Sequence, residues 1–257
     1  GSFRGGSSRR YRIANYSQRT SSAMAAAATS TLKVDHLVWA VKSLPEGMAA
    51  FEELTGVKPA MGGQHMGLGT HNALASLGNG QYLELLAWDP AQPPNPKFLG
   101  VDASPLPRLV SFCAAPAPGS CSLEAAIAEA AKAGYDGGVV EEKSRGKPDG
   151  TTIRYRLASS KHADGFATLP AGGLIPFLID WSPNELPHPS ETTPAGCTLA
   201  GLRAYHPDPA SVEPVLKALG ATACFEPRED APNGVAPAAE ARLEAILDTP
   251  KGKVTLR

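Results

Sequence analysis

The chain has 257 residues, a formal net charge of −1 at pH 7 and 42% hydrophobic residues, which is enough for a sizeable core in one large domain or two small ones. The charge balance argues against nucleic-acid binding, because no basic cluster stands out beyond the N-terminus. No apolar run in the sequence approaches the roughly 18 residues that a membrane-spanning helix needs.

The N-terminal segment differs in composition from the rest. Arginine, serine and glycine are frequent there, and the first acidic residue is Asp35. This composition is typical of a mitochondrial or plastid transit peptide, although Met24 and the four alanines after it could equally mark the true start. We therefore expect residues 1–31 to be a disordered or targeting leader outside the fold. The expected location is organellar (chloroplast or mitochondrion) if the leader is a transit peptide, and cytoplasmic otherwise.

Two apolar runs, 34–41 and 81–88, are typical of buried strands. The first contains His36 and the second contains Glu84. A carboxylate is costly to bury without a partner, and His36 is a candidate for that partner. We predict that the two residues lie on adjacent strands with their side chains in the same cleft.

A helix and a glycine-rich loop separate these two runs. Ser43 and Glu46 form a capping box, and Gly56 ends the predicted helix. Residues 62–72 are predicted to be a loop, and its candidate ligand contacts are His65, Thr70, His71 and Asn72. These groups suit an anionic or oxygen-rich ligand, although the glycines could serve tight turns alone.

The order of one strand, one helix and further strands recurs twice. The second copy has predicted strands at 109–114, 139–142, 151–158 and 174–181, and the third has strands at 198–205, 243–247 and 254–256. The pattern predicts an α+β fold of repeated β-α-β-β-β units. Arg154 and Arg156 share one face of strand 151–158, which is either a solvated face or a clamp for a substrate carboxylate. The four scattered cysteines predict reduced, mostly buried thiols.

The first two copies resemble the glyoxalase-like domain family of the vicinal oxygen chelate (glyoxalase/bleomycin resistance/dioxygenase) superfamily. The resemblance covers roughly residues 32–181. It rests on the segments 35–38, 65–72, 82–85, 149–150 and 175–181. It implies curled mixed sheets around a shared cleft, with 32–181 as a domain of paired units and 182–257 as a divergent third unit packed on it.

By this resemblance, His36 and Glu84 occupy metal-ligand positions. An imidazole and a carboxylate together suit a divalent ion such as zinc, manganese, iron or nickel. The second unit departs from the pattern, because Phe177 aligns with Glu84 and the strand around Ser111 contains no histidine. We therefore expect weak or absent metal binding unless His65 or His71 supplies a further ligand.

Two classes of function follow. In the first, a metal on His36 and Glu84 polarises an oxygen of a small oxygenated metabolite while a loop histidine moves a proton. The resemblance then implies lyase, isomerase or dioxygenase chemistry, with Arg154 as a candidate ligand contact. In the second, the protein is a non-catalytic binding or structural module, such as a subunit of an organellar complex. A homodimer or larger assembly is compatible with both.

Overall fold

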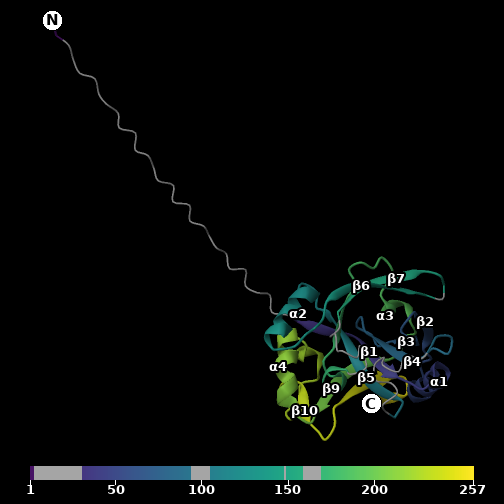
Figure 1. Ribbon diagram of the computed structural model, residues 1–257. Helices are drawn as coiled ribbons and strands as arrows, with labels where there is room; N and C mark the ends of the chain where they lie inside the picture. The colour runs from purple at the N-terminus through teal and green to yellow at the C-terminus, as the bar shows by residue number, and fades with distance from the viewer. Residues whose placement is uncertain (3–30, 94–104, 148, 159–168) are drawn as a thin grey trace.

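The computed structural model describes residues 1–2, 31–93, 105–147, 149–158 and 169–257 (Figure 1). The predicted leader therefore lies almost entirely outside the described residues. In the described part of the chain, every helix is too short or too polar to cross a membrane. All four cysteines are free thiols, and three of them are buried, as the sequence predicts.

The first unit follows the predicted order of elements. Its helix begins after Ser43, whose side chain accepts a hydrogen bond from the Glu46 N–H, and ends at Gly56 with φ +80°. The elements are β1 (Leu32–Ala40), α1 (Leu44–Thr55), β2 (Ala60–His65), β3 (Thr70–Ser76) and β4 (Tyr82–Trp88).

The segment predicted as a glycine-rich loop is instead a β-hairpin. Strands β2 and β3 pair antiparallel up to the His65–Thr70 pair, and only residues 66–69 form the turn. Gly67 and Gly69 have φ values of +79° and +74°, which only glycine adopts without strain. The sequence hides this hairpin because glycine has little propensity for a strand interior.

The second unit repeats the same order. Its elements are β5 (Arg108–Pro116), α2 (Leu123–Lys132), β6 (Val140–Gly146), β7 (Thr152–Ala158), η3 (Pro170–Gly173) and β8 (Phe177–Asp180). Strand β8 is shorter than predicted. It begins only after Pro176, which has no N–H to donate to a neighbouring strand.

These two units form one eight-stranded mixed sheet in the order β2-β3-β4-β1-β5-β8-β7-β6. Strand β1 pairs parallel with β4, β5 pairs parallel with β8, and an antiparallel β1–β5 pair joins the units. The sheet curls until its two edge strands nearly meet. A Cβ atom added at Gly63 of β2 would lie 2.6 Å from the carbonyl oxygen of Gly146 in β6. The predicted α+β fold with a curled mixed sheet is confirmed.

The third unit keeps the order of elements but not the pairing. Its first strand lies between β10, which is parallel to it, and β11, which is antiparallel, whereas β1 and β5 each pair with the last strand of their unit. Its elements are α3 (Pro189–Thr192), β9 (Thr198–His206), α4 (Pro209–Leu219), η4 (Thr222–Cys224), β10 (Val235–Pro237), β11 (Arg242–Thr249) and β12 (Gly252–Leu256).

One hydrophobic core joins all three units on the outer face of the large sheet. It runs from the sheet through the helices to the small sheet, where α2 and α4 lie next to each other (Figure 1). The Trp39 ring packs at 6.2 Å from Phe51 of α1, and Phe112 of β5 packs edge-on at 5.4 Å from Phe225. The inner face carries two smaller apolar clusters and the polar side chains described below.

The close approach of β2 and β6 predicts a difference between two glycines. Gly63→Ala should lower the free energy of unfolding by about 1–3 kcal/mol, because the new methyl group would collide with the backbone of Gly146. Gly146→Ala is the matched control. A Cβ atom there meets nothing within 4 Å, so the change should stay within about 0.5 kcal/mol. Urea denaturation of both variants measures this, and equal effects would contradict the closure of the sheet.

Candidate functional site

His36 and Glu84 meet on the inner face of the large sheet. Their strands, β1 and β4, are hydrogen-bonded neighbours, and the His36 Nε2 atom lies 3.7 Å from a Glu84 carboxylate oxygen. The predicted adjacency is confirmed. The strands are parallel, and Glu84 is level with Val38 rather than directly opposite His36.

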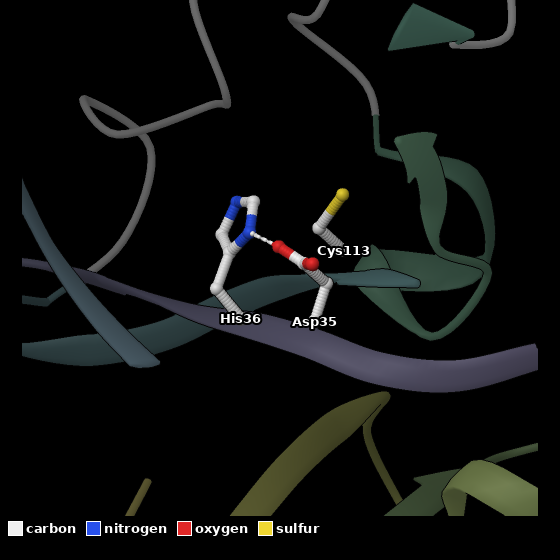
Figure 2. Close-up of side chains that lie close together, drawn as sticks. All are labelled: Asp35, His36 and Cys113. Atoms are coloured by element: carbon white, nitrogen blue, oxygen red, sulfur yellow. Dashed lines mark hydrogen bonds and ion pairs between the residues drawn. The ribbon is translucent and has the colours of Figure 1, made fainter. Parts of the chain in front are cut away.

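Asp35 carries a network that fixes His36. The Asp35 carboxylate is 2% exposed, and one of its oxygens lies 2.7 Å from His36 Nδ1 (Figure 2). The other oxygen accepts from Trp181 Nε1 at 2.9 Å and from His188 Nε2 at 3.2 Å. His188 has its proton on Nε2, because its Nδ1 accepts the backbone N–H of Ser190.

This network keeps Asp35 ionised. Burial on its own raises the pKa of the Asp35 carboxyl, but the hydrogen bonds from His188 and His36 outweigh burial and hold it well below its usual range. An ionised Asp35 can only accept hydrogen bonds, so His36 carries a proton on Nδ1. The Nε2 atom of His36 then faces Glu84. Stacking on Tyr82, with ring centroids 4.5 Å apart, and an edge contact with Phe177 at 5.5 Å hold the ring in place.

His65 presents a second imidazole to the same carboxylate. Asn72 sets its orientation: the Asn72 amide oxygen accepts the Gly63 N–H at 2.9 Å, so the amide nitrogen faces Glu84 at 2.6 Å and His65 Nε2 at 3.3 Å. His65 Nε2 is therefore an acceptor, and Nδ1 donates to Thr70 Oγ1 at 2.9 Å. The Nε2 atom lies 3.5 Å from Glu84.

The charges of this cluster follow from its burial. The side chains of Glu84 and His65 are only 12% and 15% exposed. Burial lowers the pKa of His65 despite the opposing effect of Glu84. Burial raises the pKa of Glu84, but the imidazoles of His65 and His36 and the Asn72 hydrogen bond reverse this, and the net shift is downward. The site is thus an ionised carboxylate faced by two Nε2 atoms.

Two sets of side chains could hold a metal. Ligand atoms of Asp35, His36 and Cys113 lie within 4.8 Å of one another (Figure 2). However, N–H donors already occupy both Asp35 oxygens, and burial raises the pKa of the Cys113 thiol well above its usual value. His36, His65 and Glu84 form the second set, because both imidazole Nε2 atoms lie within 3.7 Å of the Glu84 carboxylate while Nδ1 of each ring is bound to another residue.

The other predicted site residues are not all brought to this cluster. Thr70 and Asn72 lie in it through their contacts with His65. His71 lies between them in β3 and points to the opposite face, because side chains alternate along a strand. Arg154 is exposed and shares its face of β7 with Arg156, which pairs with Glu124 and Asp180.

The sequence reasoning missed two groups that complete the network. Neither Trp181 nor His188 was among the predicted site residues, yet both donate to Asp35. They also line a cavity of about 490 Å³ at one end of the inner face, together with Asp35, Ala115 and Ile179. No motif in the sequence links His188 to β1, since the two lie in different units.

The network predicts a stability effect for Asp35→Asn. One carboxylate oxygen becomes an NH2 group, which cannot accept a hydrogen bond, so at least one buried donor loses its partner. The free energy of unfolding should therefore fall by roughly 1–3 kcal/mol. Exposed Asp248→Asn is the control, with little expected change.

This difference between wild type and Asp35→Asn should depend on pH in a defined direction. Because folding depresses the pKa of Asp35, its contribution is complete at neutral pH and is lost as the pH falls below the usual value of 3.8 and through the folded-state pKa. Urea denaturation at neutral and acid pH measures this. A gap between the two proteins that persists in acid would contradict it.

Comparisons with known proteins agree with this architecture. The family model described as a glyoxalase-like domain matches residues 34–220. A comparison with curated proteins found no significant match.

Two solved structures illustrate the range of structural similarity. A hypothetical protein from Staphylococcus aureus is 14% identical, with a TM-score of 0.55 over 87% of this chain and 84% of its own. A methylmalonyl-CoA epimerase from Mycobacterium tuberculosis is 18% identical, with a TM-score of 0.36 over 61% of this chain and 92% of its own. The first likeness bears on the fold alone, and the second is too distant to bear on this chain. From the family match, which spans most of its length, the chain belongs to the glyoxalase-like domain family of the vicinal oxygen chelate superfamily.

Proposed function

We propose that the inner face of the large sheet binds a small oxygenated metabolite, with a divalent metal held by His36, His65 and Glu84. One observation carries the proposal: two imidazoles present Nε2 to one carboxylate, and each is fixed through Nδ1. A metal-binding histidine commonly donates its other N–H to a carboxylate or another acceptor, which orients the ring. Asp35 plays that part for His36, and Thr70 plays it for His65.

The cluster suits chemistry at an oxygen-bearing carbon. A bound divalent metal would act as a Lewis acid toward a carbonyl or enediolate oxygen of the substrate. Asn72 holds the Glu84 carboxylate by its hydrogen bond, and Tyr82 and Phe177 exclude water from the sides of His36. This arrangement supports lyase, isomerase or dioxygenase activity, the classes that the family resemblance implies.

One contact favours a second candidate function, a non-catalytic binding module. The Asn72 amide nitrogen reaches both Glu84 and His65, and so satisfies both without a cation. Phe177 also occupies the position where the second unit would offer a matching carboxylate. In this second candidate, the polar cluster binds the ligand by hydrogen bonds alone.

Metal binding separates these two candidates. We expect the wild-type protein, dialysed separately against zinc, manganese, iron(II) or nickel, to retain close to one equivalent of at least one of them by mass spectrometry. His36→Gln and His65→Gln should each weaken that binding at least about tenfold. His206→Gln is the control, because His206 lies in the small sheet and contacts Asp208. Wild-type protein that retains none of the four metals would reject the metal site and favour the binding module.

Glu84→Gln should remove ligand and metal binding without unfolding the protein. The glutamine oxygen can still accept from Asn72, and its amide can donate to a histidine Nε2, so the free energy of unfolding should change by no more than about 1 kcal/mol. Metal titration and urea denaturation of the same samples check both halves. If the variant unfolds, or if binding persists, Glu84 is structural.

A further inference from the structure

Arg145, near the end of β6, is a further charged group on the inner face. Arg145 pairs across the strands with Ile153, and Lys143 pairs with Tyr155. Directly paired residues of antiparallel strands point to the same face. Tyr155 packs with Cys113 and Ile179 on the inner face, so Arg145, two residues from Lys143, also points inward.

Closure of the sheet brings Arg145 to the candidate metal site. A Cβ atom added at Gly63 would lie 3.5 Å from Arg145 Cδ. Gly63 is the residue whose N–H orients Asn72, and Asn72 in turn holds Glu84. Arg145 therefore stands across the closed edge of the sheet from the cluster.

Arg145 differs in its partners from three arginines that lie elsewhere in the fold. Arg156, Arg203 and Arg228 each form a salt bridge with a carboxylate. Arg145 is half-buried and has no salt bridge within the described residues, while its neighbour Lys143 pairs with Glu141. A half-buried guanidinium keeps five N–H donors in a planar fork that matches a carboxylate or a phosphate. The register of β6 places Arg145 on the inner face, and no acidic side chain within the described residues pairs with it.

We propose that Arg145 binds an anionic oxygen group of the ligand, so that the substrate class is small oxygenated acids. The anionic group, a carboxylate or a phosphate, would lie on Arg145, and a carbonyl or hydroxyl oxygen would lie at the His36–His65–Glu84 cluster. This second contact rests on the proposed function. In this proposal the anionic group of the ligand is bound by Arg145 and not by Arg154, which lies on the outer face.

Matched probes test this proposal on the full-length protein. Lactate and lactamide differ in charge but little in shape, and glycerol 3-phosphate and glycerol form a second pair. We expect the wild-type protein to prefer at least one charged member in NMR titrations, and the preferred pair identifies the anionic group. Arg145→Gln should weaken binding of that charged probe about 10- to 100-fold and leave the neutral probe unchanged. Arg145→Lys should recover part of the preference, and Arg154→Gln should behave as wild type.

Other outcomes overturn the proposal. In one, the wild-type protein favours neither charged probe. In another, the preference for the charged probe survives in Arg145→Gln. In a third, this preference is lost equally in Arg154→Gln. Failure of the proposed function is recognised separately. His36→Gln and His65→Gln would then leave metal content unchanged, whatever the result at Arg145. Thermal denaturation of Arg145→Gln confirms that a loss of binding is not a loss of folding.

Discussion

The buried carboxylate of Asp35 is the constraint on which the site depends. It lies in β1 but accepts hydrogen bonds from the segment after β8 and from the start of α3, so one charge ties together three parts of the chain. An unpaired carboxylate at this depth would be costly, and the three N–H donors remove that cost. The same bonds leave His36 with Nε2 toward Glu84. Stability and the chemistry of the cluster therefore rest on one group.

Glycine at the sheet edge is the second constraint. The eight strands curl far enough for Gly63 to approach the backbone of β6, which a side chain would prevent. Because β2 and β6 approach each other, the Asn72–Glu84 contact lies on the β2 side of the closed edge and Arg145 lies on the β6 side. Gly63, one of the glycines that obscured β2 in the sequence, is thus the residue that allows the two halves of the site to face each other.

Strand patterns predicted the pairing of His36 with Glu84, because each residue interrupts a short apolar run and the repeat places those runs next to each other. The pattern failed where contacts are distant or where pairing is ambiguous. Nothing local connects Asp35 with Trp181 or His188. The third unit has the predicted order of elements, but its first strand pairs differently from β1 and β5, and order alone does not fix pairing. Arg154 was named as a candidate ligand contact, but it lies on the outer face of β7, and the sequence alone does not show which face of a strand turns inward.

The two halves of the inner face differ in chemistry, and this difference bears on the proposed function. In the first unit, β1 to β4 supply His36, Glu84, His65 and Asn72. In the second unit, the corresponding surface is mostly apolar or aromatic, and Phe177 stands at the position that aligns with Glu84 of the first unit. A second carboxylate would add negative charge beside Glu84 and repel an anionic ligand. With an aromatic ring there and Arg145 at the edge, the same surface tolerates an acid. Phe177, which removes one ligand position from the second unit, is thus compatible with the proposed class of substrate.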